Sequence, residues 1–229
     1  NSDLVIFGSD YEYNESSQIA YKYKRSVILP LPITLRQRVR LLKHHPTVLA
    51  KNQVGRIYNV LWIGRVAKKK RLIEAVNLLL LLSAECGIRF ELTVYGPIED
   101  DLILARAQDM LVGRNDVVLT YTGEFLWERD AACSFDLGIF LSESESFGLT
   151  AVEYVWSGLP FISTMETVPS ISFFGIEGAC LPLSELSVNP LNFLPMLKVC
   201  TIEAGALSGA LEVRNNNFSQ EFVNAIKRI

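Results

Sequence analysis

Residues 137–164 read LGIFLSESESFGLTAVEYVWSGLPFIST, and this stretch decides the fold. It opens with a continuous apolar run, Leu137–Ser142, and passes through an acidic loop. A helix candidate over Phe147–Ser157 follows, and a second apolar run, Pro160–Thr164, closes the stretch. Continuous rather than alternating apolarity is typical of parallel strands that are covered on both faces. The stretch therefore predicts a strand–helix–strand unit.

The same alternation continues on both sides of this unit. Strands alternating with helices at a spacing of about 20–30 residues predict βαβ units with right-handed crossovers. The predicted fold is therefore α/β, a doubly wound parallel sheet of the Rossmann-like kind, whose ligands bind beyond the carboxyl ends of the strands. The further strand candidates are Val60–Gly64, Phe90–Gly96, Val117–Gly123 and Ala179–Leu183, and the further helix candidates are Arg71–Cys86, Glu99–Leu111 and Glu124–Ser134.

Composition excludes several classes of protein. With 229 residues, 49% apolar and 21% charged, the chain makes one large domain, or one domain plus part of another, and is not disordered. No stretch reaches the roughly 18 apolar residues of a membrane span. Four widely spaced cysteines and two histidines exclude an ordinary zinc site and disfavour a disulfide scaffold. We expect a reducing, cytoplasmic compartment, and we see no signal peptide.

The first part of the chain departs from the βα rhythm. Leu4–Phe7 predicts a short strand, and Ser26–Pro32 predicts an extended strand that breaks into a proline-containing linker. Thr34–His45 predicts a basic helix. At the other end of the chain, Ser219–Ile229 predicts an amphipathic helix with Ser219 as its N-cap.

The net charge of −3 conceals a marked asymmetry. Residues 20–71 contain fourteen Lys or Arg and no Asp or Glu, whereas all 25 acidic residues lie elsewhere. Such a split favours a polyanionic partner at one face. For the basic helix alone, a solvated face is an equally good interpretation. A pI near 5.5 and the acidic remainder disfavour a nucleic-acid partner.

The loop and helix after Leu137–Ser142 carry the strongest functional signal. Gly148, near the predicted helix start, lets a ligand approach the backbone, and the helix N-terminus offers N–H groups to an anion. Glu145 in the loop and Glu153, two turns into the helix, suit two hydroxyl-bearing groups about one sugar apart. Their carboxylates fit a nucleotide-sugar better than a bare nucleotide. For Glu143, a solvated position is the favoured interpretation.

A second signal follows the strand candidate Val60–Gly64. Gly64 and Arg65 lead there into a run of cations, Lys68 to Arg71. On its own such a run is more commonly a solvent-exposed lysine run. Because it follows a parallel strand, we expect it on the same rim as the Glu145 loop. Cations beside a helix N-terminus are what a leaving diphosphate requires if no metal is present.

The two motifs together resemble the C-terminal donor-binding domain of family 4 (group 1) glycosyltransferases, which have the GT-B fold. Gly64-Arg65-Val66 with Lys70 is similar to the family's Gly-Arg-Leu, three residues, then Lys. The family's Ser-x-x-Glu-Gly-Phe-Gly-Leu pattern, its second Glu eight positions later and its Ala-x-Gly-x-Pro turn resemble Ser142, Glu145, Phe147, Gly148, Leu149, Glu153 and Ser157-Gly158-Leu159-Pro160. The resemblance covers roughly residues 58–182 and, weakly, the tail.

The resemblance implies a retaining, metal-independent glycosyltransferase, of the kind used in polysaccharide biosynthesis. It would transfer a sugar from a nucleotide-diphosphate sugar to a hydroxyl of a glycan or lipid-linked glycan. A UDP-sugar is the favoured donor, a GDP-sugar the alternative, and no cofactor is implied. In the implied site, Arg65 and Lys70 hold the diphosphate, Glu145 contacts the transferred sugar, Glu153 binds the ribose, and Gly64, Ser146, Phe147, Gly148 and Leu149 complete the donor pocket, the last three through backbone amides.

The resemblance also implies how the chain is organised. Residues 1–52 would be the end of an N-terminal acceptor domain with the hinge, and residues 53–229 the donor-binding domain, closed by a helix over 217–229. The missing acceptor domain is then a required partner, and we expect the chain alone to be inactive or weakly active. The basic stretch could dock on an anionic membrane surface, which implies a peripheral location at the inner face of a membrane.

Two departures from the family pattern bear on activity. Ser146 replaces the usual glycine, which is a mild change. Residues 166–170 replace the family's Gly-Gly-x-Pro-Glu turn, which lies close to the donor sugar. The alternative function is therefore a catalytically inactive, glycosyltransferase-like partner subunit. Retention of Arg65, Lys70, Glu145 and Glu153 together argues against that alternative.

Overall fold

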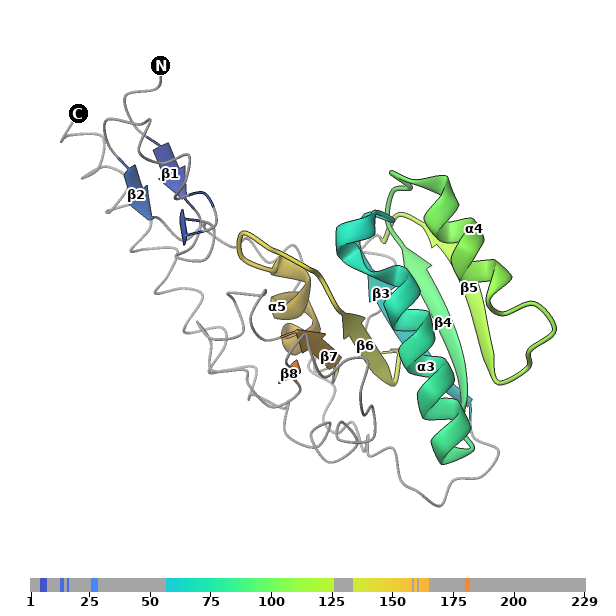
Figure 1. Cartoon of the computed structure of the whole chain (residues 1–229). Helices are drawn as coiled ribbons and strands as arrows, with labels where there is room; N and C mark the ends of the chain where they lie inside the picture. Colours follow the sequence, from blue (N-terminus) through green and yellow to red (C-terminus); the bar gives the residue numbers. More distant parts are fainter. Residues whose placement is uncertain are drawn as a thin grey trace.

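The computed structural model describes residues 57–125 and 134–157 continuously, together with 5–7, 13–14, 16, 26–28, 159, 161–164 and 180–181. The main sheet contains the strands β3 (Ile57–Ile63), β4 (Arg89–Tyr95), β5 (Val117–Gly123), β6 (Leu137–Phe140), β7 (Phe161–Thr164) and β8 (Cys180–Leu181). The helices connected to them are η1 (Lys68–Lys70), α3 (Leu72–Cys86), α4 (Asp101–Asp109) and α5 (Leu149–Trp156) (Figure 1). Every apolar run that predicts a strand of this sheet overlaps one.

The six strands form one parallel sheet in the order β5-β4-β3-β6-β7-β8. β3 pairs with β4 along its whole length, from Ile57 opposite Arg89 to Ile63 opposite Tyr95. The chain proceeds outward from β3 to β5, returns to the other side of β3 as β6, and then proceeds outward again. This is the order of a doubly wound sheet, and it places the topological switch between β3 and β6. The predicted fold class is confirmed.

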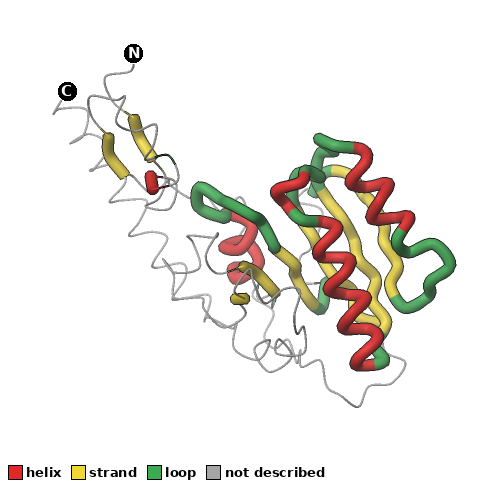
Figure 2. Tube along the Cα trace, viewed as in Figure 1, coloured by secondary structure: helices red, strands yellow, loops and turns green. Residues whose placement is uncertain are grey.

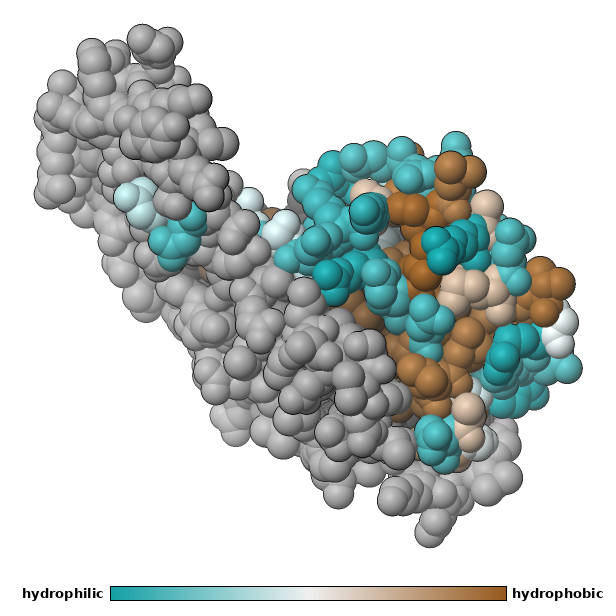
Figure 3. Space-filling view, viewed as in Figure 1, coloured by the Kyte–Doolittle hydropathy of each residue, from teal (hydrophilic) through white to brown (hydrophobic). Residues whose placement is uncertain are grey.

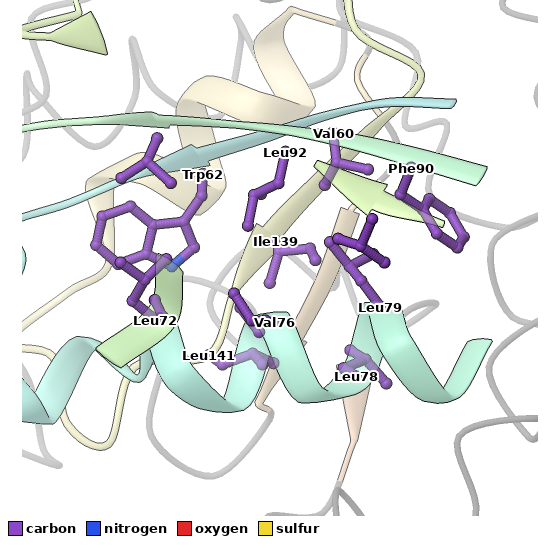
Figure 4. Packing of buried hydrophobic residues seen from close by; sticks show 14 of the residues in the cluster. Val60, Trp62, Leu72, Val76, Leu78, Leu79, Phe90, Leu92, Ile139 and Leu141 are labelled. Atoms are coloured by element: carbon purple, nitrogen blue, oxygen red, sulfur yellow. The ribbon is translucent and has the colours of Figure 1, made fainter. Parts of the chain in front are cut away.

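The sheet has helices on both of its faces. Tyr58, Val60 and Trp62 of β3 pack in one buried cluster with the apolar side of α3, and Figure 4 shows this packing with α5 on the opposite side of the sheet. The members of α3 in that cluster are Leu72, Ala75, Val76, Leu78, Leu79 and Leu82. Because each fully buried Leu contributes about 1.5–3 kcal/mol, this layer holds α3 and its N-terminal loop firmly on the sheet.

Local chemistry sets where the helices begin and end. α4 starts at Asp101 because the Asp100 side chain accepts a hydrogen bond from the Leu102 amide at 3.0 Å and caps the helix. α3 ends at Cys86 and is followed by Gly87, the C-cap, whose left-handed φ of 67° glycine adopts without steric cost. α4, which spans Asp101–Asp109, is shorter at both ends than the helix predicted over Glu99–Leu111.

Near the N-terminus, β1 (Val5–Phe7) and β2 (Ser26–Ile28) pair in parallel as a separate two-stranded sheet. Both lie within segments whose composition predicts strands. The predicted helices at 34–45 and 219–229, most of the one at 124–134 and the turn at 166–170 lie outside the described residues. Within the part of the chain that is described, no helix is long and apolar enough to cross a membrane.

Candidate functional site

The loops that follow β3, β4 and β6 lie at the carboxyl end of the parallel sheet (Figure 2). The loop after β3 spans residues 64–71, and the loop after β6 spans residues 141–148. These are the two segments whose composition predicts a site, and they flank the topological switch. In the view of Figure 3, hydrophilic residues gather at the end of the sheet where α3 begins.

The loop after β3 is fastened to the loop after β4. The Gly64 amide donates to the Tyr95 carbonyl at 2.9 Å, and the Val66 amide donates to the Pro97 carbonyl at 2.9 Å. The Val66 carbonyl in turn accepts from the amides of Glu99 and Asp100 at 3.2 and 3.0 Å. With its backbone held this way, the loop carries its cations in a defined place.

Gly96 allows the two loops to approach this closely. A Cβ atom at Gly96 would lie 1.9 Å from the Gly64 carbonyl oxygen, and its φ of 132° is one that L side chains rarely adopt. Only glycine avoids both the overlap and the strained backbone. Close contact between the strand ends therefore depends on this residue.

The loop after β3 also contacts the loop after β6. The Glu143 amide donates to the Lys69 carbonyl at 2.7 Å. The hydroxyl of Ser142, a buried residue, lies 3.2 Å from the Ser144 carbonyl and 3.5 Å from that of Lys69. The two segments singled out by the sequence are thus directly bonded across the switch point.

Lys70 and Glu145 form an ion pair across the same junction, through Nζ and Oε1. Their side chains are only 14% and 15% exposed. The Lys70 ammonium also lies 5.8 Å from the centre of the Phe140 ring, within cation–π range. A cation predicted to hold a diphosphate and a carboxylate predicted to contact the sugar therefore occupy one partly buried place.

Arg65 does not join this pair. Its guanidinium Nη1 lies 2.9 Å from Glu99 Oε2, and the two side chains are 51% and 54% exposed. Sequence reasoning missed Glu99, although it follows Gly96-Pro97-Ile98 at the end of another parallel strand. An acidic residue in such a position is a signal that could have identified it.

The start of α5 differs from the prediction. Gly148 has a φ of 88°, outside the helical region, so the helix begins at Leu149 rather than at Phe147-Gly148. Glu153 consequently lies little more than one turn into the helix, not two. Phe147 and Gly148 are buried, while Ser146 and Leu149 are exposed. The helix N-terminus carries partial positive charge toward the site.

Glu153 is half-buried, and its carbonyl accepts from both the amide and the hydroxyl of Ser157, at 2.9 and 2.8 Å. These bonds close the last turn of α5. The next residue, Tyr154, is fully buried and reaches the backbone of β3. Sequence reasoning missed Tyr154 as well.

The loop after β3 carries most of the positive charge at this site. η1 consists of three lysines and has no acidic residue in its first turn. Arg71, which ends η1 and precedes α3, has a φ of 56°, the one left-handed non-glycine residue in the described ranges. Among the same residues, no three His, Cys, Asp or Glu side chains come together as a metal site.

No protein-family model and no curated protein matches this chain. Solved structures do. The pneumococcal O-GlcNAc transferase GtfA, in complex with UDP and GlcNAc, is 19% identical with a TM-score of 0.55, over 99% of this chain and 45% of that one. Anabaena HepE, in complex with UDP and glucose, is 15% identical with a TM-score of 0.67, over 100% of this chain and 64% of that one.

A third match is the sucrose-phosphate synthase of Thermosynechococcus elongatus, 17% identical with a TM-score of 0.63, over 100% of this chain and 60% of that one. This chain thus spans about half to two thirds of the structures it resembles. At these identities the likeness establishes architecture. The chain has an α/β fold of the Rossmann-like kind found in GT-B glycosyltransferases.

Proposed function

We propose that this chain carries the donor-binding part of a retaining glycosyltransferase. The enzyme would transfer a sugar from a nucleoside-diphosphate sugar to a hydroxyl of a glycan or lipid-linked glycan. The observation that carries the proposal is the partly buried ion pair of Lys70 with Glu145 at the topological switch. In doubly wound sheets, this is where ligands bind.

The proposal assigns the positive charges to the diphosphate. Lys70 is held between Glu145 and the Phe140 ring, so its ammonium is in place before any ligand arrives. Arg65 is exposed, and its surface ion pair with Glu99 is weak enough to be exchanged for a phosphate. Backbone amides at Phe147, Gly148 and Leu149 would add the partial charge of the α5 N-terminus.

The two carboxylates are assigned to hydroxyl groups. Glu145 lies beside Lys70, where the sugar attached to the β-phosphate would be found. Glu153, further along α5, would bind the ribose, and Gly64 and Ser146 would border the pocket. UDP is the favoured nucleotide, which agrees with the UDP in the GtfA and HepE complexes.

The reaction then depends on leaving-group stabilisation. The acceptor oxygen bonds to the anomeric carbon on the face from which the diphosphate departs. The bond from that carbon to the β-phosphate oxygen breaks, its electron pair stays on the diphosphate, and the acceptor's proton leaves with the diphosphate. Positive charge fixed at the phosphates lowers the energy of this transition state, and positioning supplies the remainder.

Calorimetric titration of the chain with UDP, GDP and ADP, with EDTA present, tests the proposal. We expect micromolar binding of one nucleotide, weakened about tenfold or more by Arg65→Ala and by Glu153→Gln. Arg114→Ala is the matched control, because Arg114 is also exposed and paired, with Asp116, but precedes β5 at the opposite end of the sheet. If the folded chain binds no nucleotide, the partner-subunit function is favoured instead.

We also propose that the basic stretch at residues 20–71 contacts anionic lipid. Vesicles containing phosphatidylserine should bind the wild-type chain more tightly than the triple variant Arg36→Gln, Arg38→Gln, Arg40→Gln. Each removed charge is expected to weaken binding by about 1 kcal/mol. Equal binding of the two proteins would contradict the idea.

A further inference from the structure

Tyr154 connects α5 to β3 through a single buried hydroxyl. The hydroxyl accepts a hydrogen bond from the Ile63 amide at 3.1 Å and lies 3.3 Å from the Leu61 carbonyl, to which it donates. The side chain is fully buried. Burial raises the pKa of Tyr154 far above its ordinary value, so the hydroxyl keeps its proton throughout the physiological range and can donate.

The bonds lie on the β6 side of β3. The Gly64 amide points to β4, where it meets the Tyr95 carbonyl. Because backbone groups alternate along a strand, those of Leu61 and Ile63 point to the opposite neighbour, β6. The β3–β6 register ends at Trp62 opposite Ile139, one residue before Ile63. The Tyr154 hydroxyl thus supplies a hydrogen-bond partner for the Ile63 amide at the point where the pairing of β3 with β6 ends.

Gly138 makes the space for this side chain. A Cβ atom at Gly138 would lie 2.8 Å from two carbon atoms of the Tyr154 ring. The Tyr154 ring also packs against the ring of Phe161 in β7, with the two ring centres 5.7 Å apart. The ring therefore fits over β6 at the one residue without a side chain, and its hydroxyl reaches across to β3.

The connection joins the two halves of the candidate site. Ile63 directly precedes Gly64, which begins the cationic loop, and Tyr154 directly follows Glu153. The hydrogen bond between Ile63 and Tyr154 thus joins β3 to α5 at positions that are each one residue away from a predicted site residue. We propose that Tyr154 is a positioning residue, which fixes the distance between Glu153 and the Gly64–Lys70 loop so that one nucleoside diphosphate contacts both.

This inference rests on the proposed donor site, and its test separates the two. Tyr154→Phe removes the hydroxyl and keeps the ring. We expect UDP affinity to fall about five- to tenfold, because part of the binding energy must then be spent on ordering the two halves of the site. Inorganic pyrophosphate has no ribose for Glu153 to bind, so the affinity of Tyr154→Phe for pyrophosphate should fall by at most about twofold. Exchange of the Ile63 amide with solvent should accelerate at least about tenfold, whether or not nucleotide binds.

Two further variants guard against a purely structural explanation. Tyr58→Phe changes an equally buried tyrosine at the far end of β3 and should leave UDP affinity unchanged. Gly138→Ala keeps the Tyr154 hydroxyl but displaces the ring that carries it away from β3, and it should weaken UDP binding in the same way as Tyr154→Phe. If Tyr154→Phe does not fold, the UDP affinity of Gly138→Ala tests the positioning role in its place.

The outcomes are distinct. Wild-type chain that binds no nucleotide overturns the donor site and, with it, this role of Tyr154. Wild-type chain that binds UDP, together with Tyr154→Phe that binds UDP equally well, overturns the positioning role alone. Equal losses for UDP and pyrophosphate would also overturn it, because a general loosening of the fold gives no difference between the two ligands.

Discussion

Lys70, in the loop after β3, and Glu145, in the loop after β6, are joined as an ion pair across the point where the strand order reverses. Both side chains are largely buried, so water screens the pair less than it screens a surface pair. A lysine ammonium has three N–H donors, so an anion that binds Lys70 shares its positive charge with the carboxylate of Glu145. The pair therefore sets how tightly a diphosphate can bind.

Glu145→Gln should tighten the binding of UDP and weaken the transfer of sugar. Loss of the carboxylate charge frees Lys70, so UDP affinity should rise about two- to fivefold. Transfer by an enzyme that contains the acceptor half should fall, because a neutral amide accepts hydrogen bonds from sugar hydroxyls less strongly than a carboxylate does. Calorimetry and a UDP-release assay measure the two effects. Weaker UDP binding by this variant would contradict the assignment of Glu145 to the sugar.

Gly96→Ala should destabilise the chain by about 3–5 kcal/mol. The new Cβ would meet the Gly64 carbonyl at 1.9 Å, and the residue would keep a φ of 132°. Gly113→Ala is the matched control, since Gly113 also has a positive φ, 75°, but nothing within 4 Å of its Cβ position. It should cost about 1 kcal/mol. Urea unfolding compares them, and equal midpoints would show that the loops do not touch as described.

Removal of divalent metal should leave UDP binding unchanged. The proposed site places the ammonium of Lys70 and the guanidinium of Arg65 at the phosphates, which supplies the positive charge that Mg²⁺ provides elsewhere. Titrations with EDTA and with added Mg²⁺ should give the same affinity within about twofold. A tenfold gain with Mg²⁺ would mean that these two cations do not meet the charge of the diphosphate.

Much of the fold could be predicted from the sequence, because parallel strands covered on both faces leave continuous apolar runs. Each strand of the main sheet lies within or overlaps such a run, although β3 begins at Ile57, earlier than the run at Val60–Gly64. Strand starts were harder to predict, since Tyr58 is buried but Ile57 and Asn59 are exposed. The loops after strands were also predictable, because the fold places ligands there.

Side-chain partners could be predicted less well. Placement of Lys70 and Glu145 on one rim followed from the topology, but their direct pairing did not. Arg65 was expected at the diphosphate, and its pairing with Glu99 depends on how the loops after β3 and β4 pack. Tyr154 and Ile63 are 91 residues apart, and their bond depends on the space above Gly138. Such contacts leave no periodic signal in the sequence.

The most direct test of the central claim compares UDP with UMP in three proteins: wild type, Lys70→Ala and Lys69→Ala. Lys69 is the adjacent, exposed lysine of η1, and alanine there preserves the carbonyl that accepts from Glu143. We predict that UDP binds wild type and Lys69→Ala about 10- to 100-fold more tightly than UMP does, and that Lys70→Ala reduces this difference about tenfold, with Arg65 and the backbone amides of the α5 N-terminus supplying the rest. An unchanged preference for UDP in folded Lys70→Ala would contradict the account.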